Sequence, residues 1–191
     1  MLTFQDKYAS NISSQNGENG ILSEIINRIA PKLHYGLAVE FGAPTKQYCS
    51  NIFPLSNNLE KKYYDIEPNE AGIIKANITP ENVNEVLPVG IFLLSIDVDG
   101  QDYWIWKALT QSPQIVVIEV NSSILPPKEM TPGEHGASYM SMLNLGIEKD
   151  YFLVCHTGNM IFVKNNFRDL FPEISGNGIF NWTEYFNRSH L

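Results

Sequence analysis

The sequence has few cysteines, no cluster of basic residues and no long apolar run. Its two cysteines, Cys49 and Cys155, lie far apart without metal-site spacing, which excludes a disulfide-built fold and suggests reduced thiols. No apolar stretch approaches the roughly 18 residues of a membrane span. The N-terminus also lacks the pattern of a signal peptide. We therefore expect a cytoplasmic protein without a membrane partner.

The charge balance is acidic. The 191 residues include 21 Asp and Glu against 13 Lys and Arg, for a formal net charge of −8. A chain without basic runs has little with which to neutralise a phosphate backbone, so nucleic acid is not an expected partner. A small uncharged molecule or a cationic cofactor fits this charge better. Length and a hydrophobic content of 43% predict one domain, residues 1–191, without internal repeats.

Two stretches run from apolar residues directly into acidic ones. Residues 92–102 read FLLSIDVDGQD, and residues 115–121 read IVVIEVN. An unbroken apolar run that ends in acids is typical of a strand buried on both faces of a parallel sheet. Because ligands bind outside the carboxyl ends of such strands, five polar side chains are expected to share one crevice. They are Asp97, Asp99, Asp102, Glu119 and Asn121.

The rest of the chain alternates strands with helices. Further strands are expected at 37–43, 62–69 and 73–77, helices at 21–29, 79–87, 103–112 and 139–145, and a hairpin over 151–155 and 160–163. The predicted fold class is α/β and Rossmann-like, with a mostly parallel sheet and a C-terminal antiparallel hairpin. Residues 1–20 are expected to form an N-terminal loop. The aromatic-rich tail, 165–191, is expected to pack on the domain or on a partner, and in the second case would make a homo-oligomer.

The first expected strand ends in an acid and a glycine. Gly42 would let a backbone approach a ligand closely, as glycines do in nucleotide-binding turns. No second or third glycine follows, so a dinucleotide fingerprint is absent. A carboxylate roughly 20 residues beyond such a turn can hold a ribose diol, because it accepts two hydrogen bonds at once. Glu67 is that candidate, with Asp65 as its rival.

Two further groups of polar residues have alternative interpretations. Gln15, Asn16 and Glu18 precede the first expected helix, where they would either cap it or lean over a cofactor. His135 lies in a long loop rich in proline and glycine, residues 122–136. It is either a solvated side chain or a base beside the acidic crevice.

Several segments resemble, in order, a family of FkbM-like, S-adenosylmethionine-dependent methyltransferase-like proteins. They are SQNGENGI, VEFGA, IEPN, ITPENVNEVL, LLSIDVDGQDYWIWKAL, VVIEVN and GASYMSML, spread over residues 14–143. The resemblance implies a Rossmann-like class I methyltransferase fold, with S-adenosylmethionine as cofactor and O-methylation, often of sugar or polyketide hydroxyls. It assigns cofactor binding to Glu40, Gly42, Glu67 and Asp97. We also expect Gln15, Asn16, Glu18 and Ala43 to bind the cofactor.

Methylation of a hydroxyl needs a positioned acceptor and a group that takes or weakens its proton. One route uses a divalent ion held by Asp97, Glu119 and Asn121, with Asp99 or Asp102 beside it, and all-oxygen ligands favour Mg²⁺ or Mn²⁺. In the other route no metal binds, and His135 or a carboxylate such as Asp97 or Asp99 is the base. Repulsion among so many carboxylates favours the metal.

Two other functions remain open. In the first, Asp97-Val98-Asp99 is a metal-binding DxD motif of an enzyme that acts on a sugar nucleotide. In the second, the chain is a non-catalytic binding module that keeps the fold. In a purely structural interpretation, Asp99-Gly100 is a turn and Asp97 caps a helix. This interpretation does not account for the repeated pattern at Glu119 and Asn121.

Overall fold

The computed structural model describes residues 3–30, 36–56, 58–124, 128–129 and 136–174. The predicted base His135 and residues 175–191 of the tail lie outside this part of the chain. Among the described residues, no helix combines the length and the apolar character that crossing a bilayer would need.

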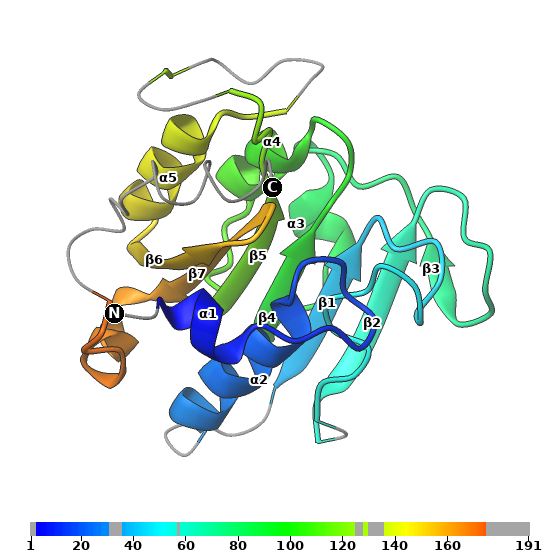
Figure 1. The fold of residues 1–191 in the computed structure, drawn as a ribbon. Coiled ribbons are helices and arrows are strands. Elements are labelled where there is room, and N and C mark those ends of the chain that lie inside the picture. Colours follow the sequence, from blue (N-terminus) through cyan, green and yellow to red (C-terminus); the bar gives the residue numbers. More distant parts are fainter. Residues whose placement is uncertain (1–2, 31–35, 57, 125–127, 130–135, 175–191) are drawn as a thin grey trace.

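The protein has an α/β fold built on a seven-stranded, mostly parallel sheet (Figure 1). The strand order is β3-β2-β1-β4-β5-β7-β6. Strands β1 to β5 pair in parallel, and β7 runs antiparallel to both of its neighbours, β5 and β6. The bounds are β1 Leu37–Phe41, β2 Glu60–Asp65, β3 Ile73–Lys75, β4 Ile91–Ile96, β5 Ile115–Glu119, β6 Tyr151–His156 and β7 Asn159–Lys164.

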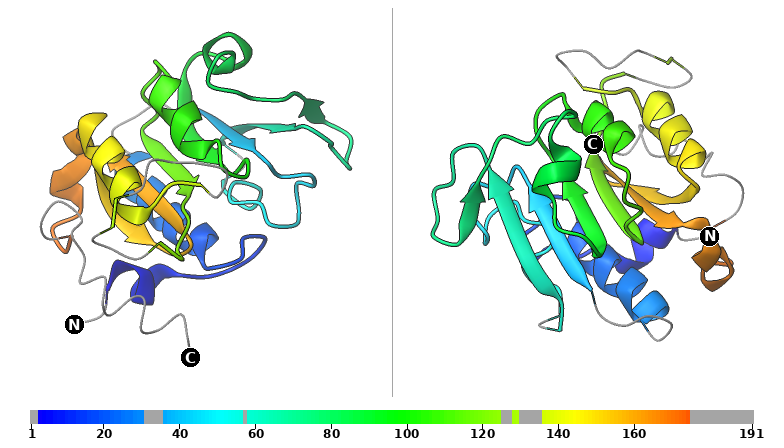
Figure 2. Two further views of the ribbon diagram at one scale, coloured as in Figure 1. Left: turned by 90° about the horizontal axis from the view of Figure 1, so that it is seen from above. Right: turned by 180° about the vertical axis from the view of Figure 1, so that it is seen from behind.

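Helices cover both faces of the sheet (Figure 2). One face carries α1 (Phe4–Tyr8), α2 (Glu18–Ile29) and the 3₁₀ helix η2 (Asn165–Leu170), and the other carries α3 (Val83–Val86), α4 (Asp102–Ala108) and α5 (Tyr139–Glu148). Successive side chains of a strand point to opposite faces, so each face has its own apolar core. The central strands are therefore buried on both sides, as their apolar runs predicted.

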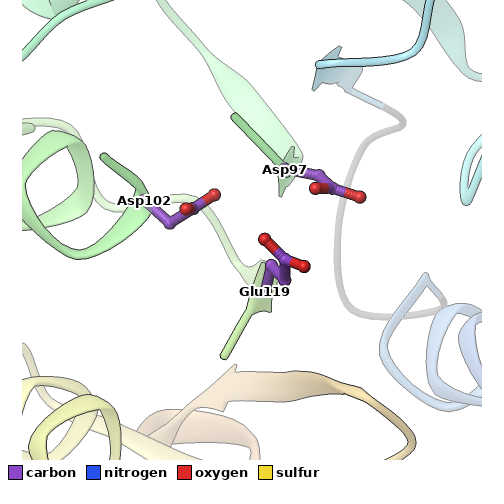
Figure 3. Close-up of side chains that lie close together, drawn as sticks. All are labelled: Asp97, Asp102 and Glu119. Atoms are coloured by element: carbon purple, nitrogen blue, oxygen red, sulfur yellow. The ribbon is translucent and has the colours of Figure 1, made fainter. Parts of the chain in front are cut away.

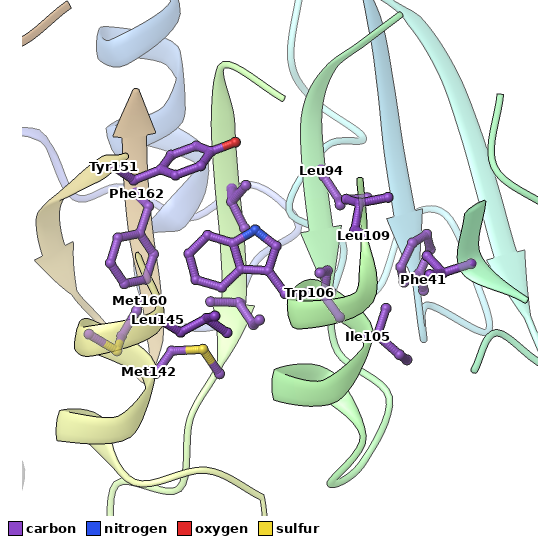
Figure 4. Packing of buried hydrophobic residues seen from close by; sticks show 14 of the residues in the cluster. Phe41, Leu94, Ile105, Trp106, Leu109, Met142, Leu145, Tyr151, Met160 and Phe162 are labelled. Carbon is purple, nitrogen blue, oxygen red and sulfur yellow. The ribbon is translucent and has the colours of Figure 1, made fainter. Parts of the chain in front are cut away.

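Trp106 of α4 anchors one of these cores (Figure 4). Its fully buried ring lies 5.5 Å from the ring of Tyr151 and 5.0 Å from that of Phe162, measured between centroids. Aromatic pairs at this spacing add to the stabilisation that burial gives. The contact fixes the crossover helix between β4 and β5 against the hairpin, and so fixes the loops at both strand ends.

The N-terminal segment is not the continuous loop that was predicted for residues 1–20. Residues Phe4–Tyr8 form α1, which begins with a capping box in which Thr3 Oγ1 accepts the Asp6 N–H at 3.1 Å and Asp6 Oδ2 accepts the Thr3 N–H at 3.0 Å. Phe4 is buried under this helix. The prediction missed α1 because a five-residue helix is too short to show a period.

Two other boundaries differ from expectation. Helix α3 begins at Val83, not at Thr79, because residues 79–82 form a hydrogen-bonded turn in front of it. The tail begins with η2, and its residues Phe167 and Phe171 are buried against their own chain. The start of the tail therefore packs on the domain, and the predicted oligomer contact stays a prediction.

Candidate functional site

A cavity of about 460 Å³ opens at the carboxyl ends of β4, β5 and β6. Five segments of the chain form its wall. They contribute Gln15 and Asn16; Asp97, Asp99, Gly100 and Asp102; Glu119, Val120, Asn121 and Ser122; Gly136; and Gly158 and Asn159. All five residues that were predicted to share a crevice therefore line one cavity, next to the N-terminal segment that precedes α2.

Three carboxylates converge in this cavity (Figure 3). Asp97, Asp102 and Glu119 each offer one oxygen, and these oxygens all lie within 4.8 Å of one another. Asp97 directly follows β4, and Glu119 is the last residue of β5. Their positions are set by the parallel register of these strands, in which Ile96 pairs with Ile118. Adjacent strands lie only about 4.8 Å apart, so acids at matching positions are necessarily close.

Asp102 reaches the cluster through a tight turn between β4 and α4. Asp99 and Gly100 have positive φ values of 51° and 92°, which turn the chain back. The Asp102 carboxylate then accepts the Val98 N–H at 2.9 Å and the Gly100 N–H at 3.1 Å. The turn thus fixes the position of the carboxylate that it surrounds.

The three carboxylates titrate at unusually high pH. Burial, followed by the charges of Asp102, Asp99 and Glu18, raises the pKa of Asp97 to about 6. Burial and the neighbouring acids raise the pKa of Glu119 to about 7. The pKa of Asp102 is also raised by burial, against the hydrogen bonds of its turn. Charged forms are therefore disfavoured in the protein alone, and a bound cation would favour them.

Asn121 also lines the cavity, and its role as a metal ligand stays a prediction. Its Oδ1 accepts the backbone N–H of Ser123 at 3.0 Å and the Ser123 hydroxyl at 2.5 Å. Asp102 joins Asp97 and Glu119 as a possible carboxylate ligand.

The three N-terminal candidates differ in their position. Gln15 and Asn16 line the cavity, whereas Glu18 is fully buried at the start of α2. Glu18 Oε2 accepts the Asn16 N–H at 2.8 Å, and its Oε1 accepts the Thr157 hydroxyl at 2.7 Å. Glu18 makes no capping hydrogen bond to α2, and it connects the N-terminal segment to the β6–β7 turn.

Asn19 is a buried polar residue that the sequence interpretation did not assign to the site. Its Oδ1 accepts the backbone N–H groups of Ile12, Ser13 and Ser14 at 2.8–2.9 Å. Its Nδ2 donates to the carbonyl oxygens of Ser50 and Asn51. One side chain thus shapes the segment that carries Gln15 and Asn16. A polar residue on the otherwise apolar face of α2 was the available signal.

The candidates for cofactor binding at β1 and β2 do not line this cavity. Of the described residues, those in its wall do not include Glu40, Gly42, Ala43 or Glu67. Glu40 is buried, and its carboxylate accepts the Ser50 hydroxyl at 2.5 Å and the Asn51 N–H at 2.7 Å, while burial raises its pKa to about 7. Glu40 therefore anchors the turn after β1, and its contact with a cofactor stays a prediction.

Glu67 has the exposure that a ligand contact needs. It lies just beyond the end of β2, next to the β1 turn that contains Gly42. Its backbone N–H donates to Asp65 Oδ1 at 2.7 Å, so Asp65 shapes the turn that presents Glu67. Ala43 is buried beside Gly42.

His156 is the only histidine among the described residues, and its side chain is buried near the cavity. The sequence interpretation treated it as part of a hairpin turn.

Comparison with known proteins adds no assignment, because no protein-family pattern matches the chain and no curated protein is significantly similar to it.

Proposed function

We propose that the protein is an S-adenosylmethionine-dependent methyltransferase that methylates a hydroxyl of a small, sugar-like acceptor with the help of a divalent cation. The observation that carries the proposal is the sheet order β3-β2-β1-β4-β5-β7-β6 with β7 reversed. This order is typical of class I methyltransferases. In open α/β sheets ligands bind outside the carboxyl ends of the strands, and the cavity lies at those ends.

The acidic cluster supports a cation in the cavity. Asp97, Asp102 and Glu119 offer oxygen ligands close enough to share one ion. Their pKa values are raised first by burial and then by the neighbouring carboxylates, and a bound cation would offset both effects. Hard oxygen ligands of this kind suit Mg²⁺ or Mn²⁺. Such an ion would lower the pKa of an acceptor hydroxyl and orient it.

The β1 and β2 turns support the cofactor assignment. S-adenosylmethionine would supply the methyl group. The exposed carboxylate of Glu67 is suited to the two hydroxyls of a ribose, and it lies next to the Gly42 turn because β1 and β2 pair in parallel. The acids of the neighbouring cavity would also favour the positive charge of a sulfonium group.

Titration calorimetry with S-adenosylmethionine tests the cofactor directly. We expect saturable binding, and we expect Glu67→Ala to weaken it by about 1–3 kcal/mol, the loss of hydrogen bonds to a charged group. Glu60→Ala is the matched control, because Glu60 is an exposed acid at the opposite end of the same strand. An absence of heat at millimolar cofactor would contradict the proposal.

A second candidate is a metal-dependent enzyme that acts on a sugar nucleotide. It is favoured by one observation, namely that both acids of Asp97-Val98-Asp99 line the cavity. Binding of a nucleotide sugar in the presence of Mn²⁺, without binding of S-adenosylmethionine, would support this candidate. Binding of neither would favour the non-catalytic module.

A further inference from the structure

Ser122 and His156 form a hydrogen-bonded pair at the wall of the cavity. Ser122 follows β5 and lines the cavity, and its Oγ lies 3.2 Å from Nε2 of His156. His156 ends β6 and is only 5% exposed. Its ring packs edge-on against Tyr139, with 5.4 Å between the centroids. A ring held in this way has little freedom to rotate, so it fixes the serine hydroxyl.

The histidine of this pair is uncharged at neutral pH. Burial lowers the pKa of His156 to about 4, against a hydrogen bond to the backbone of Gly158 that acts in the opposite direction. The pair therefore adds no positive charge to the cavity. A serine hydroxyl can donate one hydrogen bond and accept two, so the bond to His156 leaves Ser122 able to bind a ligand.

The rest of the cavity wall also consists largely of groups that can form hydrogen bonds with a hydroxyl. Beside the carboxylates, it presents the side-chain amides of Gln15, Asn16 and Asn159. Of the described residues in the wall, none carries a positive charge. Amides, carboxylates and a hydroxyl bind hydroxyl groups well, whereas the carboxylates repel phosphates and other carboxylates.

We propose that Ser122, positioned by His156, recognises a hydroxyl group of a neutral, polyhydroxylated ligand in this cavity. The inference rests on the proposed function in one respect, since such a ligand would be the methyl acceptor. Ser122 would contact the ligand, and His156 would act through Ser122 as a positioning residue. Binding can be measured without any methyl transfer.

Saturation-transfer NMR on the full chain, in a chelator that keeps the carboxylates free of metal, tests this inference. The probes are D-glucose, D-galactose and myo-inositol, with glucose 6-phosphate as the anionic comparison. We expect at least one neutral probe to bind, and glucose 6-phosphate to bind more weakly. Ser122→Ala should weaken binding of the neutral probe about fivefold, as expected for one hydrogen bond. Ser56→Ala is the control, because Ser56 is exposed and lies outside the wall.

Variants of His156 separate positioning from folding. His156→Phe keeps a ring against Tyr139 but removes Nε2. It should therefore weaken probe binding as Ser122→Ala does and leave Mn²⁺ binding unchanged. His156→Gln, which retains a hydrogen-bonding side chain, should recover part of the affinity. If His156→Phe loses cooperative melting, the probe affinities of Ser122→Ala and His156→Gln decide whether His156 positions Ser122 for binding.

Three results would overturn the inference: no neutral probe binds, glucose 6-phosphate binds as tightly as the neutral probes, or Ser122→Ala binds like the wild type. A parallel titration with S-adenosylmethionine separates the two proposals. Cofactor binding without probe binding refutes the role of Ser122 alone. Probe binding that Ser122→Ala weakens, without cofactor binding, refutes the proposed methyltransferase alone.

Discussion

Gly42 lies directly against the main-chain carbonyl of Asp97, so a side chain at Gly42 would overlap with that oxygen. Gly42 also has a positive φ of 81°. The glycine after β1 is therefore required by the close approach of the β1 and β4 ends, whether or not a cofactor also passes over it. It holds in place the strand end that carries Asp97.

Gly42→Ala should consequently be strongly destabilising. We expect the free energy of unfolding to fall by more than about 3 kcal/mol, since both the backbone conformation and the overlap oppose a methyl group. Urea denaturation provides the measurement. Gly90→Ala is a close control, because Gly90 has the same φ of 81° but open space around the added Cβ. It should cost only about 1–2 kcal/mol. Equal losses in both variants would show that the contact with Asp97 is unimportant.

Removal of either Asp97 or Glu119 should impair cation binding. We expect Asp97→Ala and Glu119→Ala each to weaken Mn²⁺ binding by at least about tenfold, because each removes one of three clustered carboxylates. Electron paramagnetic resonance of free Mn²⁺ measures the affinity. Glu60→Ala, a change of the same charge far along the sheet, should bind like the wild type. Wild-type affinity in both cluster variants would show that these acids hold no metal.

The same carboxylates should make the metal-free protein less stable as the pH rises. Their pKa values are about 6 for Asp97 and about 7 for Glu119, against roughly 4 in an unfolded chain. Between pH 4 and 7 the folded state therefore holds more protons than the unfolded state, and its stability falls as the pH increases. Asp97→Asn and Glu119→Gln should each stabilise the metal-free protein at pH 7.5.

We expect each gain to be about 1 kcal/mol, because solvent reduces the penalty that burial and the neighbouring carboxylates place on the charged forms. The gain should shrink at pH 5, where the wild-type groups are largely protonated. Thermal melting in a chelator, repeated with Mg²⁺, gives the comparison. If the gain is as large at pH 5 as at pH 7.5, the penalty on the charged forms is not its cause.

Asn19→Ala should loosen the N-terminal segment. The change removes an acceptor for three backbone N–H groups and a donor to two carbonyl oxygens, so we expect a loss of about 2–4 kcal/mol in unfolding free energy. Chemical denaturation measures the loss. Asn144→Ala, which removes one exposed hydrogen bond to Glu129, is the control and should have almost no effect. Similar effects from the two variants would refute the role of Asn19.

Parts of the site that depend on strand order could be predicted from the sequence. The apolar runs of β4 and β5 are long enough to identify buried parallel strands, and that pairing alone brings Asp97 near Glu119. The sequence also placed Asp102 in the crevice, but the turn that positions its carboxylate depends on the left-handed backbone of Asp99, which no pattern announced. The hydrogen bonds between Asn121 and Ser123 could not be predicted either.

Contacts between residues that are far apart in the sequence could not be predicted from the sequence pattern either. Glu18 and Thr157 are separated by 139 positions, and only the assembled sheet brings them into hydrogen-bonding distance. The pairing of Ser122 with His156 has the same origin, since one follows β5 and the other ends β6. Periodicity reports which residues are buried, but it does not report which buried polar groups meet.

The reversal of β7 brings a segment that is distant in sequence from the acids to the wall of the cavity. Because Asn159 pairs with Glu119, the tip of the β6–β7 hairpin returns to the edge that carries the carboxylates. Gly158 and Asn159 at this tip belong to the cavity wall, yet they lie far along the chain from the acids. Insertions in this short turn would remodel the mouth of the cavity without disturbing the register of β4 and β5.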